Sequence, residues 1–200
     1  MVAWSLLAES RHDVTCTCNL PSFAGIVPVQ HLKAMNTLKP ASIGTVIAGT
    51  LRPEDLLSAF LSEVESLALL SGEFLSRPEN FPLRDYFANV VGEAQDCFAE
   101  DGESLKPGEC SEDGQSNATE VLEALQDALE HFAPPYCYFG THPGDGADFG
   151  FWPSLEAIDE LPTVEDSDGA KELGEDCKAV NDHGNVTVYG GDGRILLELV

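Results

Sequence analysis

The sequence predicts an α+β fold, with about three helices packed on a mostly antiparallel sheet made of a hairpin and a C-terminal three-stranded meander. Apolar residues recur at helical spacing in three segments between about 50 and 132. From 136 to 199, short strand-forming runs alternate with turns rich in Gly and Asp. Helices followed by strands are typical of the α+β class. We therefore expect a single domain over 35–200, with its helical part at about 50–132 and its sheet part at about 136–199.

The first helix is expected to begin near Thr50, after a short extended piece at 42–49. Thr50 can cap the helix, and Pro53 suits the first turn because that position needs no backbone N–H. Gly72 is expected to end or bend the helix. Its apolar face consists of Leu57, Phe60, Leu61, Val64, Leu67 and Ala68.

The second helix has the clearest pattern and is expected to open at Pro82. The short connection at 77–78 predicts that it forms an antiparallel hairpin with the first helix. Its apolar positions follow at steps of three and four residues. They are Leu83, Tyr86, Phe87, Val90, Val91, Ala94, Cys97 and Phe98.

A polar loop and a third helix complete the helical part. Residues 100–116 carry three turn pairs and predict a loop. Asn117 is expected to cap a helix at about 118–132, because Glu120 follows three residues later as in a capping box. Pro134 and Pro135 end this helix, since proline cannot continue it.

The first part of the sheet is a predicted hairpin. Strands at 136–142 and 147–152 flank the turn 143–146. Ser154 is expected to cap a short helix at 155–161. Residues 162–176 are acidic and rich in turn residues, and they predict a surface connection.

The chain then closes with a predicted meander of strands at 177–182, 185–189 and 194–199. We expect this meander to share one sheet with the hairpin, with the helices on one face. Apolar residues alternate along the last two strands as in a half-buried sheet. They are Val186, Val188, Ile195, Leu197 and Leu199.

The charge is strongly acidic. Thirty-five Asp and Glu against ten Lys and Arg give a net charge of −25. Such a surface repels nucleic acid and anionic membranes. It has two interpretations: a solvated acidic surface, or a face that imitates DNA phosphates and occupies the basic groove of a nucleic-acid enzyme. Counterion release would favour such a mimic as it favours DNA.

The N-terminal segment and the cysteines bear on location. Residues 1–34 differ in composition from the rest, and we expect them to be disordered or an over-called extension, with translation starting at Met35. The six cysteines contain no Cys-x-x-Cys pair, so we expect free thiols in a reducing cytoplasm. The sequence contains no run of about 18 apolar residues, so it predicts no membrane-spanning helix.

One candidate site is metal-binding. The hairpin turn offers His142, Asp145 and Asp148, and the meander turn adds His183. If both turns met in one sheet, these side chains could hold a divalent metal or perform acid–base chemistry. The alternative is that all four serve turn geometry alone.

The other candidate site is aromatic. The hairpin carries more aromatic residues than one of its faces can bury, so an exposed set would form a protein-binding surface. The alternative is that helices cover one face and residues 162–176 cover the other. The candidate binding residues are Tyr136, Tyr138, Phe149, Phe151 and Trp152.

Three phrases of the sequence are distinctive: Pro-Pro-Tyr-Cys-Tyr-Phe-Gly, Gly-Asp-Gly-Ala-Asp-Phe-Gly-Phe-Trp-Pro-Ser and Val-Asn-Asp-His-Gly-Asn-Val-Thr-Val-Tyr. They resemble phrases in small acidic proteins of unknown function from phages, plasmids and other bacterial mobile elements. The similar blocks, 50–98, 133–154 and 180–189, cover about half of the chain. The resemblance supports a start near Met35 and implies no activity.

These observations favour a non-catalytic, cytoplasmic protein-interaction module without a cofactor. Its expected partner is a protein, in the most concrete version a basic nucleic-acid-binding enzyme inhibited by DNA mimicry, with no direct binding of nucleic acid or membrane. The alternative is a small metal- or ligand-binding domain, with hydrolysis as one option, that uses the 142–148 turn and His183.

Overall fold

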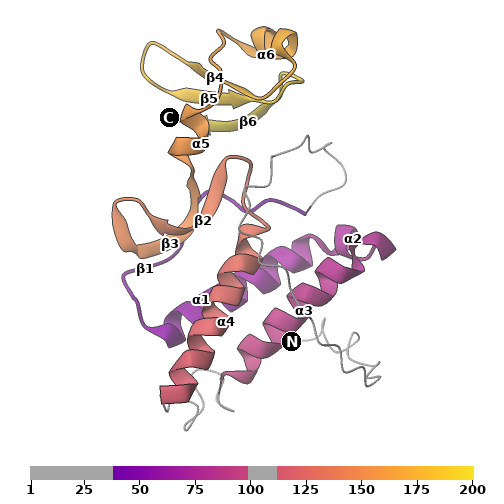
Figure 1. Ribbon diagram of the computed structural model, residues 1–200, viewed down its shortest axis with the longest axis vertical. Coiled ribbons are helices and arrows are strands. Elements are labelled where there is room, and N and C mark those ends of the chain that lie inside the picture. Colours follow the sequence, from indigo (N-terminus) through magenta and orange to yellow (C-terminus); the bar gives the residue numbers. More distant parts are fainter. Residues whose placement is uncertain (1–37, 99–111) are drawn as a thin grey trace. The chain divides into compact units, whose positions relative to one another are not determined.

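The computed structural model describes residues 38–98 and 112–200, and these form helices and two antiparallel three-stranded sheets (Figure 1). The α+β class is therefore confirmed. The expected start at Met35 and the expectations for residues 1–34 lie outside the described residues. Among the helices that are described, none combines the length and the hydropathy of a membrane span.

The helical part has more elements than the sequence predicts. Two short helices fill the connection after the first long helix, where only residues 77–78 were expected to intervene. The bounds are α1 Pro53–Leu70, α2 Gly72–Leu75, the 3-10 helix η1 Pro78–Asn80, α3 Phe81–Asp96 and α4 Glu112–Glu130.

The start of α1 differs slightly from the prediction. Arg52 is the N-cap residue and caps no backbone group with its side chain. Thr50 acts one step earlier, because its hydroxyl accepts the Arg52 N–H and donates to the carboxylate of Asp55. Pro53 lies in the first turn as predicted. Thr50 therefore stabilises the entry to the helix without capping it.

Helix α4 begins at Glu112, so the predicted loop to residue 116 and the predicted cap at Asn117 are wrong. The apolar pattern could not reveal this start, because the first buried side chain described in α4 is Val121. Gly114, expected in a turn, is helical.

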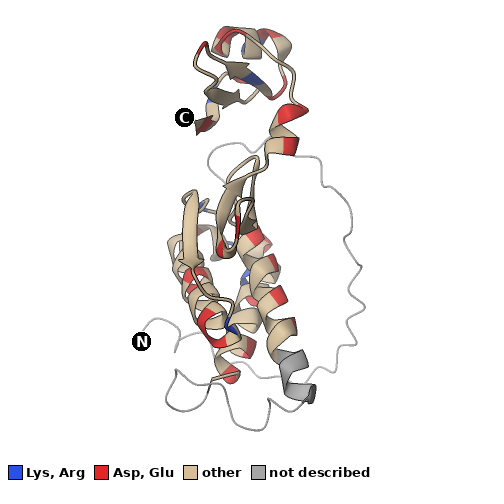
Figure 2. Ribbon diagram, turned by 90° about the vertical axis from the view of Figure 1, so that its left-hand side faces the viewer, with Lys and Arg blue, Asp and Glu red and all other residues tan. Residues whose placement is uncertain are grey.

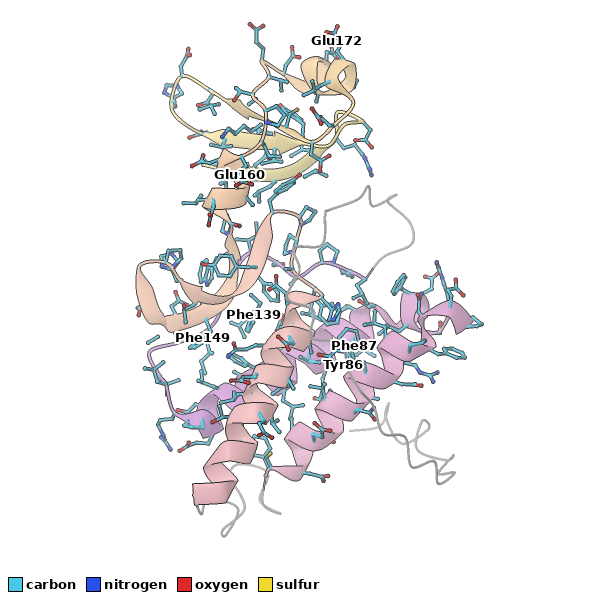
Figure 3. The ribbon with its side chains drawn as sticks, viewed as in Figure 1. Tyr86, Phe87, Phe139, Phe149, Glu160 and Glu172 are labelled. Atoms are coloured by element: carbon cyan, nitrogen blue, oxygen red, sulfur yellow. The ribbon has the colours of Figure 1, made fainter. Side chains whose placement is uncertain are left out.

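Three helices and the first sheet share one core. Phe60 of α1 is fully buried and lies edge-on to Phe139 and Phe149, with ring centroids 5.1 and 5.4 Å away. Phe87 of α3 stacks on Phe132 just after α4, at 4.9 Å. Figure 3 shows Phe139 and Phe149 on the side of the hairpin that faces the helices.

The first sheet has the order β1-β3-β2. The hairpin of β2 (Cys137–His142) and β3 (Asp145–Pro153) is confirmed, with a turn narrower than predicted. The extended piece before α1 is strand β1 (Gly44–Ala48), and it pairs antiparallel with β3. This distant pairing occupies the open edge of the hairpin.

The second sheet contains the predicted meander of β4 (Cys177–Val180), β5 (Val186–Tyr189) and β6 (Ile195–Leu199). The single sheet that we expected is therefore wrong, since hairpin and meander belong to different sheets. Val188 and Leu197 are buried as predicted. Ile195 is exposed, because the register between β5 and β6 shifts after Val188.

Two short helices flank the second sheet. Ser154 caps α5 (Leu155–Asp159) as predicted, by accepting the Ala157 N–H. Helix α6 (Ser167–Leu173) lies in the segment predicted as an irregular surface connection. Asp166 caps α6, and Gly174 ends it in the left-handed conformation that favours glycine.

Candidate functional site

The tip of the first hairpin uses two of its candidate ligands to form the turn. His142 Nδ1 accepts the Gly144 N–H at 3.1 Å, and Asp145 Oδ1 accepts the Ala147 N–H at 3.0 Å. The two residues also face each other in the ladder. Both side chains therefore have a structural role in the turn. This agrees with the alternative interpretation, in which these residues serve turn geometry.

Asp148 differs from its neighbours. Its Oδ2 accepts a hydrogen bond from the Thr45 hydroxyl of β1 at 3.3 Å. Its Oδ1 is shielded from solvent, and no hydrogen-bond donor reaches it from the part of the chain that the structure describes. Buried carboxylate oxygens usually have a partner, so this atom is the one feature of the tip that turn geometry does not explain.

His183 belongs to the second sheet, whereas His142, Asp145 and Asp148 belong to the first. It occupies the turn between β4 and β5, where its backbone N–H donates to Asn181 Oδ1 at 2.9 Å. The condition that both turns share a sheet is not met. Within residues 38–98 and 112–200, no three His, Cys, Asp or Glu side chains are grouped to hold a metal ion.

The aromatic candidates divide between the two faces of the hairpin. Phe149 and Phe151 are buried in the core beside Phe139. Tyr138 and Trp152 form a cross-strand pair on the other face. The Trp152 indole donates to the Gly140 carbonyl at 3.1 Å, and the His142 ring lies edge-on to it at 4.6 Å. These outer side chains thus partly cover each other.

Tyr136 belongs to a different contact. Its backbone has φ 61°, and β2 begins only at the next residue. Its hydroxyl donates to Asp176 Oδ2 at 2.7 Å, and its ring packs against the core of the second sheet. Burial and the hydrogen bond to Asp176 raise the pKa of Tyr136. This tyrosine, just before β2, therefore contacts the second sheet.

The acidic residues include a stripe along α4 that we call the α4 stripe: Glu120, Glu123, Asp127 and Glu130, all exposed. They follow one another at intervals of three, four and three residues, which places them on one side of the helix. Ten residues at 1.5 Å each span about 15 Å along the axis. Figure 2 shows the acidic side of α4.

The last turn of α4 contains no basic residue. Five of the Lys and Arg side chains in the described ranges form ion pairs with acids elsewhere. They are Arg52, Arg84, Lys171, Lys178 and Arg194. The stripe was not among the sites predicted from the sequence, although the Glu-x-x-Glu-x-x-x-Asp-x-x-Glu spacing at 120–130 predicts it.

Glu130 joins the α4 stripe to the first sheet. One of its carboxylate oxygens accepts the backbone N–H of Phe139 in the edge strand β2, at 2.6 Å. Glu130 as a whole is exposed, but its carboxyl is partly buried against β2, and this burial raises its pKa. The Phe139 N–H opposes this shift, and Asp127 adds to it. The pKa of the nearby Cys137 thiol is raised to about 11, mainly by burial and further by the charge of Glu130. That thiol is therefore protonated at neutral pH and is a poor nucleophile.

Replacing Glu130 with Ala should lower the free energy of unfolding by about 1 kcal/mol, because the Phe139 N–H loses its acceptor. Glu130→Gln keeps an acceptor and should cost less. Since the folded-state pKa of Glu130 is raised, its ionisation opposes folding as pH increases. In urea denaturation, the free energy of unfolding of Glu130→Gln relative to the parent should therefore increase from pH 4.5 to pH 8. A difference in unfolding free energy that decreases as pH rises would contradict the raised pKa.

Comparison of the chain with protein-family models, with curated proteins and with solved structures gives no match. The described residues define an α+β protein with two antiparallel sheets and an acidic helix face.

Proposed function

We propose that this chain is a non-catalytic, cytoplasmic interaction protein that uses the α4 stripe in place of DNA phosphates. Its partner is a basic nucleic-acid-binding protein, and its effect is to inhibit that protein by occupying the DNA groove. Carriage on a phage, plasmid or other mobile element fits this role, since such elements gain when a host nucleic-acid enzyme is blocked.

The observation that carries the proposal is the spacing of the α4 stripe. Three intervals over about 15 Å give a mean axial separation of about 5 Å between carboxylates. One strand of B-DNA carries a phosphate about every 3.4 Å of axis. The two spacings agree within a factor of two, so a groove that binds successive phosphates can bind successive carboxylates of α4. The net charge of −25 adds long-range attraction to a basic partner.

The test starts from partners captured on the full chain from a bacterial lysate and released by salt. Each purified partner is then assayed for DNA binding with and without the chain. The double variant Glu123→Gln, Asp127→Asn removes two charges from the α4 stripe. Counterion release predicts that its log affinity falls less steeply with log salt, by about 1.8 in slope. Its inhibition of DNA binding should fall at least tenfold.

The matched control removes two exposed charges elsewhere, through Glu160→Gln and Glu172→Gln (Figure 3). This control should keep the affinity of the parent within about twofold and leave the salt slope unchanged, because these residues lie outside the α4 stripe. Equal losses in both double variants would mean that net charge alone acts. A captured partner that binds DNA and the chain at the same time would rule out mimicry.

A second candidate is the binding of a divalent metal at the hairpin tip, supported by the unpartnered Oδ1 of Asp148. Carboxylate and imidazole ligands suit several divalent metals. Metal analysis of the purified chain tests it. Stoichiometric metal that is lost in Asp148→Asn and His142→Ala, and retained in His183→Ala, would favour a site at the tip. Metal retained in all three variants would exclude it.

A further inference from the structure

A groove of about 370 Å³ lies between the start of the first sheet and α1. One wall is the backbone segment 39–46, which leads into and includes most of β1. The other wall is the flank of α1 formed by Glu63, Ser66, Leu67 and Leu70. The groove uses no residue of the α4 stripe and none of the candidate metal ligands.

Strand β1 is an edge strand. In the order β1-β3-β2, its only strand partner among the described residues is β3. Its outer edge therefore presents backbone N–H and C=O groups that another extended segment can bond. The groove is next to this strand, so an added strand would have side-chain space beside it.

The wall that carries β1 is held in place at several points. Before the strand, the Lys39 N–H donates to the Ser71 hydroxyl at 3.0 Å, and the Ala41 N–H donates to the Phe132 carbonyl at 2.8 Å. After it, the Gly49 N–H donates to the Ala147 carbonyl at 3.0 Å. An edge fixed in this way needs little ordering when a partner binds, which favours affinity.

The chemistry of the groove selects a basic and apolar occupant. Ile43 and Leu70 are 44% and 55% exposed on its rim. Glu63 is half-buried in the α1 wall, and this burial raises the pKa of its carboxyl. A carboxylate that has lost part of its hydration gains more from a cation placed beside it than a fully solvated one does.

We infer that this groove binds an extended basic peptide from a partner protein, which adds to the edge of β1 as a fourth strand. Its Lys or Arg side chains lie against Glu63, and its apolar side chains contact Ile43 and Leu70. Strand addition of this kind takes affinity from backbone hydrogen bonds and specificity from alternate side chains. A second copy of this chain is disfavoured as the occupant, because two chains of charge −25 repel each other.

The probe is a fluorescent peptide that repeats Lys-Lys-Val-Val, so that each face of the extended strand carries both Lys and Val. It is titrated against the full chain and followed by anisotropy. Glu63→Gln should weaken binding at least fivefold. Glu123→Gln removes the same charge from the α4 stripe and should change binding less than twofold, which separates this site from the proposed DNA mimicry. Leu70→Asn, at an exposed position, should also weaken binding without unfolding the chain.

Backbone pairing is tested with two further peptides of the same sequence and charge, N-methylated at either all odd-numbered or all even-numbered positions. Alternate N–H groups of a strand point to opposite edges. One methylated peptide should therefore lose at least tenfold in affinity and the other should not. Equal affinity of both methylated peptides with the parent peptide, or equal effects of Glu63→Gln and Glu123→Gln, would overturn the proposal. A dimer that Leu70→Asn dissociates would assign the groove to a second copy instead.

Discussion

Phe60→Ala should lower the free energy of unfolding by about 3–5 kcal/mol, the range for deleting a fully buried phenylalanine. The Phe60 side chain has no exposed surface, and its ring lies edge-on to both Phe139 and Phe149. Each edge-on aromatic pair adds about 0.5–1.5 kcal/mol beyond the burial of area. Phe60 is therefore the contact through which α1 holds the inner face of the first sheet.

Guanidinium denaturation monitored by circular dichroism measures this loss. Phe81→Ala is the matched control, because Phe81 is 37% exposed at the start of α3 and lies under the Arg84 guanidinium at 4.3 Å from the ring centroid. Its loss should be about 1 kcal/mol. Similar losses in the two variants would show that the sheet does not depend on α1 for its stability.

Local patterns in the sequence were sufficient for most individual elements. The apolar spacing of α1 and α3 predicts both helices, since that spacing repeats over four or more turns. The hairpin and the meander follow from short runs separated by turn residues. Ser154 and the helix after it could be predicted because an N-cap acts within three residues.

Long-range pairing could not be predicted in this way. Strand β1 pairs with β3 about 100 residues later in the chain, and no local signal at 44–48 identifies that partner. Because this pairing was not predicted, the edge of the hairpin that β1 occupies was assigned to the meander. A single sheet of hairpin and meander was therefore the simpler prediction. The capping contacts of Asp166 could have predicted α6, but the acidic, turn-rich composition of 162–176 concealed them.

The candidate sites show the same division. The turn roles of His142 and Asp145 follow from adjacent residues, and they were one of the two alternatives predicted from the sequence. The α4 stripe depends only on helical spacing and was predictable. The groove beside β1 was not, because its walls come from two segments that meet only after α1 folds back along the strand. The unpartnered oxygen of Asp148 likewise requires the pairing of β1 with β3.

Gly150→Ala should detach β1 from the first sheet. A Cβ atom at position 150 would lie 2.1 Å from the Gly44 carbonyl oxygen and 2.9 Å from the Thr45 Cα. Both neighbours are backbone atoms of β1, so no side-chain rotation can relieve the contact. Overpacking of this kind costs about 1–3 kcal/mol, and we expect a loss near the upper end.

Gly146→Ala in the same strand is the matched control, because nothing lies within 4 Å of the added Cβ atom. Its stability should stay within about 0.5 kcal/mol of the parent. Hydrogen exchange by mass spectrometry should show faster exchange at 44–48 in Gly150→Ala alone. The same variant should lose the Lys-Val peptide, because the edge that binds it has moved. If Gly150→Ala loses exchange protection at 44–48 but keeps its peptide affinity, the peptide binds elsewhere. If the exchange protection at 44–48 is unchanged, β1 and β3 separate enough to admit a methyl group.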